Sequence, residues 1–585
     1  MNDNLSHLGA EIEIRRVTDR VTLSMSSRIA CTLGLDFGTL SCRAVIVAVE
    51  GGATLGSSVV EFARGIVTHG RPESIATQHP DDWERSARRA CSKALSDAGV
   101  DASSVMGVGV DFTACTLVPC LDDSTPLVSL RGNEDRVHAW PKLWKHRGAL
   151  RQAAELTAAT VRADWPHGER FGGKISEQWL HPKAMELWDE DRSAFDAADL
   201  LLEAGDWFVW RMAAAADTAT AASGRSAIVP EGAPPPIRSA CQAGYKACWS
   251  SADGGTALLP DALLDSLRPG GFAPALAHRM RGRVQAPGAR AGTLGAWGAS
   301  LLGLASGTPI ATSTIDAHAA VPGSGAGAPH ELVLVLGTSG CFMLNAPPNA
   351  DHAVHGCLGR VPDGILPGLV GFEAGQSALG DAFAWLSVLT GQSVAELAAA
   401  AAAEKAAARA SSASAASALS QPLLLDFLNG SRSPYNDGML QASASGLTLG
   451  TTPAGLYNAI ADGLACGTRG MVDAFGDARD AASGDVAPIA IERVIAAGGI
   501  ARSAPAYVQT LADALQRQIE ISPVEQASAQ GAAILGAVAA GVFPDARAAV
   551  GAMTPTPPGG VCVVRPDVNE AERYDALHAR YCRLA

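Results

Sequence analysis

Two stretches of this sequence could bind phosphate, because each places a turn of small and hydroxyl residues between two apolar runs. The first is LGLDFGTLSCRAVIV at 33–47, and the second is LVLVLGTSGCFML at 332–344. Turns of this kind leave their backbone N–H groups open to phosphate oxygens. Either turn alone is more typical of an ordinary hairpin, but the pair favours a clamp on one polyphosphate, with one turn in each of two domains. The candidate contacts are Gly38, Thr39, Gly337 and Thr338.

A third segment and two carboxylates could complete such a site. The run VIAAGGIARSAPAYVQTLADAL at 494–515 predicts a strand, a Gly-Gly turn and a helix, so that Gly498 and Gly499 let the backbone pass close to a nucleoside. Asp36 directly precedes the first turn, and Asp316 follows a short apolar run before the second hairpin. An ordinary strand-to-helix turn, a turn aspartate and a capping aspartate remain the alternatives from these residues alone.

The elements that would position these residues alternate between apolar strands and Ala/Leu-rich helices, which predicts an α/β architecture. Residues 30–49 form two strands around a turn, and 104–123 repeat the pattern of strand, turn and strand. Between them, 81–98 form a helix for which Asp81 or Asp82 is the expected N-cap. The N-terminal half is therefore expected to begin with antiparallel hairpins.

The second half starts a fresh α/β pattern, which places a domain boundary near residue 308. Residues 292–314 predict a helix, a turn and a strand, while 221–238 are rich in Pro, Ala and Gly and predict a loop. The low-complexity run 394–420 favours helix early and a loose segment later. Further helices are expected at 453–475, 503–516 and 526–541, and strands at 493–497 and 518–522.

Length and composition fit a globular protein of two large domains and argue against several kinds of partner. The chain has 585 residues, of which 48% are hydrophobic and 18% charged. A net charge of −14 argues against nucleic acid or an anionic membrane as the main partner. Twelve cysteines without a C-x-x-C pair indicate reduced thiols in a cytoplasmic protein. Residues 1–28 lack the apolar core of a signal peptide and are expected to be a variable or disordered extension.

Six motifs in the same order resemble the FGGY family of carbohydrate kinases, which have the actin-like, ribonuclease H-like ATPase fold. The motifs are GLDFGTLSCRAVIV, GVGVDFTACT, STIDAHAAVPGSGA, LVLGTSGC, GFEAGQSALGDAFAW and AAGGIARSAPAYVQTLADALQRQI. Further segments are similar to the members that phosphorylate ribulose: KLWKHR, RFGGKISEQWLHPKAMELW, CQAGYKACW and LLLDFLNGSRSP. The resemblance implies two actin-like domains flanking a deep catalytic cleft, with sugar binding at 29–308, ATP binding at 309–562 and a helical tail at 563–585.

The resemblance also implies roles for individual residues. Asp316 matches the family's catalytic base, which accepts the proton of the sugar hydroxyl, and Asp36 matches the aspartate near Mg²⁺. Gly340 stands where these kinases tend to have a threonine, which could remove one nucleotide contact. The implied sugar-binding residues are Ala114, Trp144, Lys246, Asp316 and Glu373. The implied ATP-binding residues are Gly38, Thr39, Gly337, Thr338, Gly498 and Gly499.

The activity implied by the resemblance is ATP-dependent phosphorylation of ribulose, with L-ribulose first, at the 5-hydroxyl and with Mg²⁺. Alternatives within the class are kinases of D-ribulose, xylulose or glycerol. A non-enzymatic actin-like ATP-binding switch would have no use for a sugar-side lysine and carboxylate. A catalytically dead relative is disfavoured because Asp36 and Asp316 are both present. The oligomeric state stays open, a homodimer included.

Overall fold

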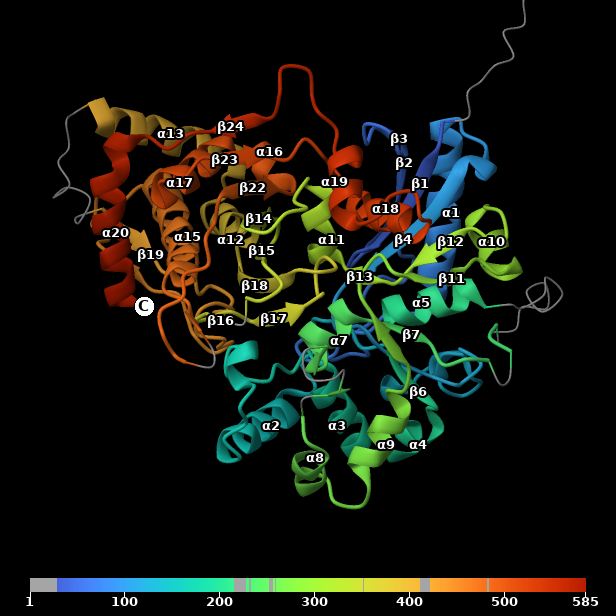
Figure 1. Cartoon of the computed structure of the whole chain (residues 1–585). Coiled ribbons are helices and arrows are strands. Elements are labelled where there is room, and N and C mark those ends of the chain that lie inside the picture. The colour runs from blue at the N-terminus through green and yellow to red at the C-terminus, as the bar shows by residue number, and fades with distance from the viewer. Residues whose placement is uncertain are drawn as a thin grey trace, which may run out of the picture.

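Two β-sheets and a group of helices make up the protein. The computed structural model describes residues 29–214, 228–230, 233–251, 256–257, 259–350, 352–410, 421–480 and 483–585. Each sheet has seven strands and forms one lobe, and the helical group lies below the lobes in Figure 1. The N-terminal extension, part of the expected loop at 221–238 and the later part of the low-complexity run lie outside the described residues.

The first sheet starts with the expected hairpin. Its strands are β1 (Cys31–Phe37), β2 (Ser41–Ala48), β3 (Thr54–Glu61), β4 (Val105–Phe112), β11 (Arg290–Thr293), β12 (Pro309–Ala311) and β13 (Thr314–Ile315). β1, β2 and β3 pair antiparallel, and β4 pairs in parallel with β1. β12 and β13 each pair in parallel with β4. Residue 308 therefore does not separate the strands of the two lobes, because strands beyond it complete the first sheet.

The hairpin expected at 104–123 is not formed. β4 pairs with β1 and β12, whereas β5 (Leu117–Cys120) pairs antiparallel with β6 (Leu200–Glu203). Every residue of β4 except Met106 is buried, which is typical of a strand in the interior of a sheet. A pattern of strand, turn and strand in the sequence does not show whether the two strands pair with each other. Two consecutive strands that belong to different sheets, as β4 and β5 do, therefore look like a hairpin.

Helix α1 (Pro80–Ala98) begins earlier than expected. Its N-cap is His79, whose Nδ1 accepts a hydrogen bond from the backbone N–H of Asp81. Neither Asp81 nor Asp82 caps the helix, because a proline at the first helical position already fixes its start. Asp82 is buried instead and accepts a hydrogen bond of 2.6 Å from Arg64.

The second sheet repeats the order of the first. Its strands are β14 (Glu331–Leu336), β15 (Gly340–Ala346), β17 (Gly359–Pro362), β18 (Val370–Gln376), β22 (Arg493–Ala497), β23 (Ile519–Ile521) and β24 (Cys562–Val564). β14, β15 and β18 pair antiparallel, and β22 and β23 continue the sheet in parallel with β14. The doubled hairpin of the sequence is therefore one strand pattern used twice, with each Gly-Thr turn at the same place in its sheet.

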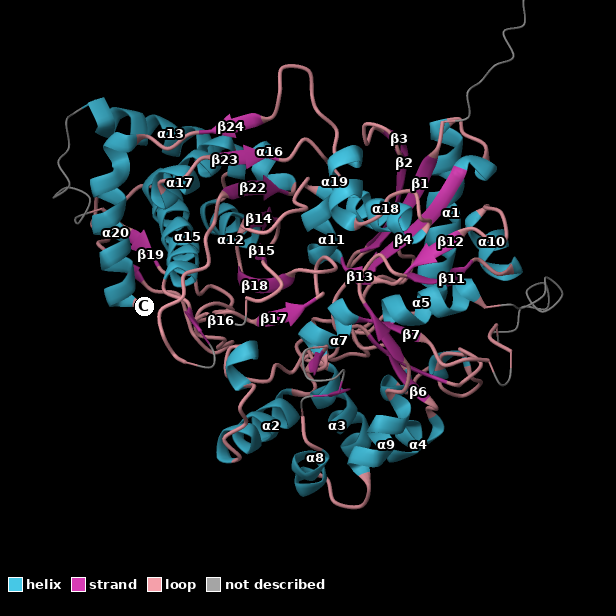
Figure 2. Ribbon diagram, in the orientation of Figure 1, coloured by secondary structure: helices cyan, strands magenta, loops and turns pink. Residues whose placement is uncertain are grey.

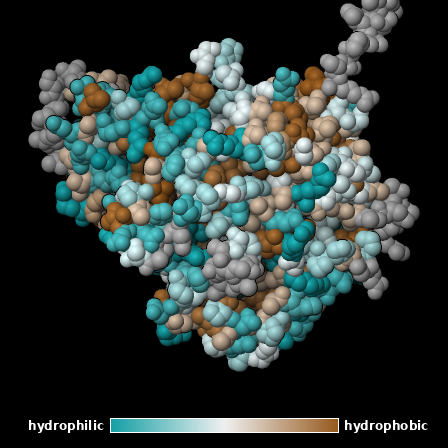
Figure 3. Space-filling model, in the orientation of Figure 1, coloured by the Kyte–Doolittle hydropathy of each residue, from teal (hydrophilic) through white to brown (hydrophobic). Residues whose placement is uncertain are grey.

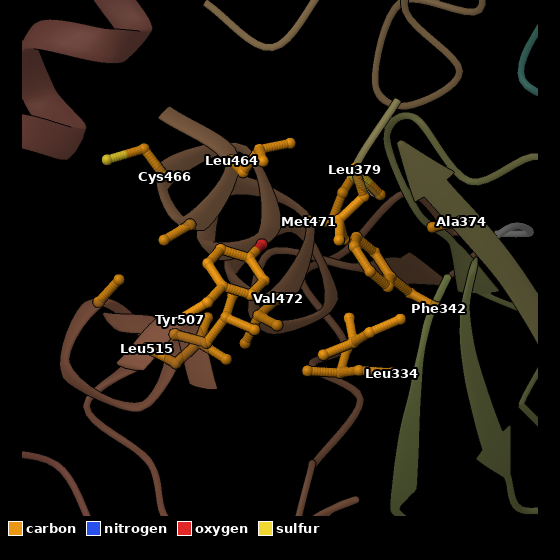
Figure 4. Close-up of a cluster of buried hydrophobic side chains, with 14 of the residues drawn as sticks. Leu334, Phe342, Ala374, Leu379, Leu464, Cys466, Met471, Val472, Tyr507 and Leu515 are labelled. Atoms are coloured by element: carbon orange, nitrogen blue, oxygen red, sulfur yellow. The ribbon is translucent and has the colours of Figure 1, made fainter. Parts of the chain in front are cut away.

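An apolar core lies between the second sheet and its helices. These helices are α12 (Gly380–Thr390), α13 (Val394–Ala410), α15 (Pro453–Gly476), α17 (Pro505–Leu515) and α20 (Ala571–Leu584). Figure 4 shows Leu334, Phe342 and Ala374 of the strands on one side of this core, with Met471 and Tyr507 of the helices on the other. The helices and strands expected after residue 450 are confirmed to within two residues.

Two helices join the lobes. They are α11 (Asp316–Gly323) and α18 (Ala527–Ala539), which lie between the two sheets in Figure 1. α18 comes from the C-terminal half but packs on β1, where a Cβ on Gly34 would lie 1.8 Å from a carbonyl oxygen of the helix. α11 crosses α18 where a Cβ on Gly531 would lie 1.8 Å from a carbonyl oxygen of α11. The lobes are thus in direct backbone contact at this crossing.

The helical group is an insertion in the N-terminal half that the sequence pattern did not reveal. It contains α2 (Leu150–Arg162), α3 (Leu180–Glu190), α4 (Arg192–Ala197), α8 (Asp261–Leu267) and α9 (Phe272–Arg279). It has its own buried core, which includes Phe171, Trp179, Phe195 and Phe272. Figure 2 shows that the strands concentrate in the lobes while this part is mainly helical. α5 (Ala204–Ala213) and α7 (Ala240–Lys246) lie between this group and the first sheet, whereas α10 (Ala296–Leu302) packs on α1 beside that sheet.

Surface and thiol chemistry agree with the composition. On the face in Figure 3, apolar side chains lie in small groups among polar ones. All twelve cysteines are free and nine are buried, as expected for reduced thiols. Within the described ranges no single helix is long and apolar enough to span a membrane, and α12 and α13, which together reach that length, are bent by 95° at their junction.

Candidate active site

Three aspartates meet at the ends of neighbouring strands in the first sheet. Asp36 of β1 is the direct register partner of Asp111 of β4. β13 pairs with β4 at the same level, where Thr314 is the partner of Asp111, and Asp316 follows as the first residue of α11. Because β1, β4 and β13 run parallel, their carboxyl ends lie at one edge of the sheet, and this edge collects the three side chains.

Burial and neighbouring charges change the pKa values of two of these carboxyl groups, Asp111 and Asp316. Nη1 of Arg43 lies 2.9 Å from Oδ2 of Asp36 and forms an ion pair with it. Burial raises the pKa of Asp111 well above its usual range, and the charges of Asp36 and Asp316 raise it further. Burial and then the charge of Asp36 raise the pKa of Asp316 to about 7, although the backbone N–H of Ala317 donates to its Oδ1 at 2.8 Å. A carboxyl group with this pKa can exchange a proton near neutral pH.

A second charged group lies at the junction of the lobes. Lys246, the last residue of α7, and Glu373 of β18 form an ion pair of 2.8 Å between Nζ and Oε2. Both side chains are buried, with exposed fractions of 9% and 3%. Burial alone would lower the pKa of Lys246, but the charge of Glu373 raises it. Burial alone would raise the pKa of Glu373, but Lys246 and its other neighbours lower it to about 2. The structure therefore brings the two predicted sugar-binding residues together as a charged pair.

Two further residues surround Glu373. Nη2 of Arg432 donates to Oε1 of Glu373 at 2.9 Å. Nε2 of His318 lies 3.7 Å from Oε2 of Glu373, and burial lowers the pKa of this imidazole to about 3, so that it is neutral. Neither ring nitrogen of His318 has a hydrogen-bond partner within the described part of the chain, and the ring packs on Tyr245. Such a buried polar group is suited to a hydroxyl partner.

Ala114 and Trp144 lie on segments between the first sheet and the helical group. Both are partly exposed, and Nε1 of Trp144 donates to Oγ1 of Thr39 at 3.2 Å. The buried ammonium of Lys183 donates to the backbone oxygens of Cys115 and of the residue before Trp144. Lys183 thereby holds both segments in place. The structure also brings Trp144, a predicted sugar-site residue, against Thr39 of the first Gly-Thr turn.

The second Gly-Thr turn contacts the start of α12, and the Gly-Gly turn lies beside the end of β14, which leads into the Gly-Thr turn. The backbone oxygen of Thr338 accepts hydrogen bonds from the N–H groups of Leu379 and Asp381 at 2.9 and 3.2 Å, which ties the turn to the start of α12. Gly498 has a φ of 92°, and a Cβ there would lie 2.6 Å from the carbonyl oxygen of Leu336, so glycine is required at this position.

The remaining predicted nucleotide contacts are spread over both lobes. Gly499 faces open space and begins α16 (Gly499–Ser503), and Gly337 is partly exposed. A Cβ on Gly340 would lie 3.1 Å from the Phe342 ring, so a larger residue there would crowd the core. Gly38 lies in the turn of the first sheet, and among the described residues no hydrogen bond joins this turn to the second one. A common grip of the two turns on one polyphosphate therefore stays a prediction.

Comparisons with known proteins place this site in a family. Residues 332–540 match the C-terminal domain of the FGGY family of carbohydrate kinases. A ribulokinase of Shouchella clausii is 35% identical over 519 residues, which cover 87% of this chain and 86% of the relative. A ribulokinase of Mycolicibacterium smegmatis is 34% identical over 566 residues, with 94% and 93% covered. The chain belongs to the FGGY family of carbohydrate kinases. It is accordingly an ATP-dependent sugar kinase rather than a non-enzymatic switch.

Solved structures of FGGY kinases share the fold of this chain. The xylulose kinase of Rhodospirillum rubrum has a TM-score of 0.69 at 20% identity, with 95% of this chain and 98% of that chain covered. The glycerol kinase of Plasmodium falciparum, solved with ADP, has a TM-score of 0.69 at 12% identity, with the same shares covered. The expected two-domain actin-like fold is thus confirmed.

Two residues of this FGGY kinase site were missed by the sequence reasoning. Asp111 carried a signal, because G-x-D-F occurs both at 34–37 and at 109–112, and the two phenylalanines stack at 4.1 Å between ring centroids. Repeated aspartates at equivalent strand ends could have marked both as site residues. Arg432 lies in LLLDFLNGSRSP, where nothing in the local pattern indicates that the chain returns to Glu373.

Proposed function

We propose that this kinase transfers the γ-phosphoryl group of ATP to the 5-hydroxyl of ribulose, with L-ribulose as the main substrate. The observation that carries the proposal is the arrangement of Asp316, Lys246 and Glu373 in a chain that is 34–35% identical to several ribulokinases. The charge of Lys246 lowers the pKa of Asp316 while its ammonium contacts Glu373, so one cation serves both carboxylates. A polyol placed between Asp316 and Glu373 would meet the carboxylates as hydrogen-bond acceptors and the ammonium of Lys246 as a donor.

Asp316 is proposed as the general base. Its carboxylate would take the proton of the 5-hydroxyl as the oxygen attacks the γ-phosphorus, and its pKa of about 7 suits that task at neutral pH. The backbone N–H of Ala317 and the first turn of α11 fix its orientation. Ala114 and Trp144 would shape the wall of the sugar site.

The donor set at the strand ends fits Mg²⁺. Carboxylate oxygens are the ligands this cation prefers, and both oxygens of Asp111 lack a hydrogen-bond partner within the described residues. Asp36 would hold the ion, with Asp111 and Asp316 close to it. The ion would neutralise charge on the transferred phosphoryl group. Arg43 would orient Asp36 for this role through their ion pair.

Both glycine-threonine turns and the Gly-Gly turn are proposed to bind ATP. Gly38 and Thr39 would approach the phosphates from the first lobe, and Gly337 and Thr338 from the second. Gly498 and Gly499 would pass beside the nucleoside, where the absence of side chains leaves room. An ATP-dependent enzyme of sugar metabolism is expected to work in the cytoplasm.

A panel assay tests the substrate. ADP release coupled to NADH oxidation is measured with L-ribulose, D-ribulose, L-xylulose, D-xylulose and glycerol at equal concentrations. We expect kcat/KM for L-ribulose to exceed that for glycerol by about 100-fold or more, because glycerol has fewer hydroxyls and would leave some of the buried polar groups without partners. A higher kcat/KM for xylulose or glycerol would contradict the ribulose assignment and leave a sugar kinase of other specificity.

A further inference from the structure

Arg432 is held beside Glu373 by its own backbone. The N–H of Ser433 donates to the backbone oxygen of Gly375 at 3.0 Å, and the N–H of Gly375 donates to Oγ of Ser433 at 3.1 Å. This reciprocal pair fixes the segment to β18, two residues from Glu373. The guanidinium then donates through Nη2 to Glu373 and through Nη1 to Sγ of Cys341 at 3.3 Å. Its side chain is 31% exposed, which leaves N–H groups open beside the site.

Hydrogen-bond donors outnumber acceptors at this end of the site. Oε2 of Glu373 accepts from Lys246 and Oε1 from Arg432, so both carboxylate oxygens are engaged. A guanidinium carries five N–H groups and an ammonium three, and neither can accept a hydrogen bond. Two cations face one carboxylate, and His318 adds no charge because it is neutral. A ligand that fits here must present an acceptor next to Arg432.

The chemistry of a pentulose supplies such an acceptor. The furanose ring of a 2-ketopentose closes through the 5-oxygen, so the 5-hydroxyl is free only in the open-chain form, in which C2 is a carbonyl. A carbonyl oxygen accepts hydrogen bonds and cannot donate them. Resting on the proposed function, we propose that Arg432 selects the open-chain keto form of the sugar by donating hydrogen bonds to its C2 carbonyl oxygen.

The sequence of charged groups from Asp316 through Lys246 and Glu373 to Arg432 supports placing C2 of the sugar next to Arg432. Lys246 lowers the pKa of both Asp316 and Glu373, and so acts on both of these carboxyl groups. Arg432 contacts the other oxygen of Glu373. A chain with its 5-hydroxyl at Asp316 would pass Lys246 with its middle hydroxyls and bring C2 toward Arg432.

The test compares ribulose with ribitol, which differs from it only by reduction of the C2 carbonyl. Steady-state kcat/KM is measured for both sugars, together with the KM for ATP, in the wild-type protein and in Arg432→Gln and Arg432→Lys. Arg493→Gln is the matched control, because Arg493 has a side chain 32% exposed and pairs with Glu331 and Glu520 away from the site. Circular dichroism and thermal melting establish that each variant is folded.

We expect Arg432→Gln to lower kcat/KM for ribulose by about 10- to 100-fold, the value of a hydrogen bond from a charged donor, and to change that for ribitol by less than about threefold. The KM for ATP should stay unchanged, and Arg493→Gln should alter neither sugar. Should Arg432→Gln not fold, Arg432→Lys carries the test, since it keeps the charge beside Glu373 but loses the planar fork, and it should reduce ribulose turnover more than ribitol turnover.

Equal losses with ribulose and ribitol would overturn the inference, because Arg432 would then act only by orienting Glu373. Unchanged kinetics with both sugars would overturn it as well. A wild-type protein that releases no ADP with ribulose is a different result, which would refute the proposed function and this inference together.

Discussion

Replacing Asp316 by asparagine tests the chemistry most directly. The asparagine keeps the size of the side chain and an Oδ1 that can accept the hydrogen bond from Ala317, which spans 2.8 Å in the native protein. It cannot accept the proton of the sugar hydroxyl. We expect kcat to fall by about 10²- to 10⁴-fold, the usual contribution of a general base. The KM for ribulose should change little, because Lys246 and Glu373 are untouched.

The pH profile gives the same test a second readout. Burial and the charge of Asp36 raise the pKa of Asp316 from 3.8 to about 7, so the carboxyl is mostly protonated at pH 6 and mostly ionised at pH 8. Since the base acts only when ionised, kcat/KM of the wild type should rise about tenfold between these pH values. Arg43 lowers this pKa, so Arg43→Gln should move the rising limb to higher pH.

The assay follows ADP release at saturating ATP, with sugar binding measured separately by calorimetry. Asp261→Asn is the control, because Asp261 is also the first residue of a helix, α8, but lies in the helical group. It should behave as the wild type does. An Asp316→Asn variant that keeps more than about a tenth of the wild-type kcat, with the same rise between pH 6 and pH 8, would refute the assignment of the base.

Four further substitutions test the remaining parts of the site and the helix crossing beside it. Lys246→Met and Glu373→Gln should each raise the KM for ribulose about tenfold or more and leave that for ATP unchanged in steady-state kinetics. Glu373→Gln should also lower the Tm more than the double variant does, because it leaves the buried ammonium of Lys246 unpaired, whereas after Lys246→Met the carboxylate of Glu373 still pairs with Arg432. Gly337→Val should raise the Kd for MgATP about tenfold in calorimetry without unfolding, since a Cβ there meets only a carbonyl oxygen at 3.7 Å; unchanged affinity would contradict the clamp. Gly531→Ala should destabilise the protein by about 3 kcal/mol or more, seen as a lower Tm, because its Cβ would lie 1.8 Å from a backbone oxygen; an unchanged Tm would show that the crossing can open.

Four strands of the second sheet, β14, β15, β22 and β23, were predictable because their signals are local. β22 and α17 are separated by the Gly-Gly pair and the short helix α16, and their periodicity and the glycines suffice to place them. The hairpin repeat likewise predicted one topology used twice. Partner choice was not predictable in this way: β4 reads as half of a hairpin, yet it pairs with β1 across the long connection that holds α1. Such pairings depend on the burial of both faces, which periodicity does not encode.

For the site residues, too, the sequence predicted candidates but not which of them contact each other. Lys246 and Glu373 were predicted from motif context, but as separate groups awaiting hydroxyls, whereas the structure pairs them with each other. Read singly, Lys246 looks like a surface lysine, because a sequence does not show that α7 ends against β18. Arg432 was missed for the same reason, since a residue on an irregular segment carries no periodicity that indicates its direction.

The two ends of the site are anchored differently, and this bears on catalysis. Asp316 starts α11, whose backbone lies so close to α18 that a Cβ on Gly531 would lie 1.8 Å from a carbonyl oxygen of α11. Lys246 and Glu373 instead meet through an ion pair of their side chains, next to the packing of α7 on β17, where a Cβ on Gly244 would lie 2.2 Å from Val361. The sugar would lie between this charged pair and a base that the helix crossing holds in place, so that water, which cannot contact both ends at once, would be a poor phosphoryl acceptor.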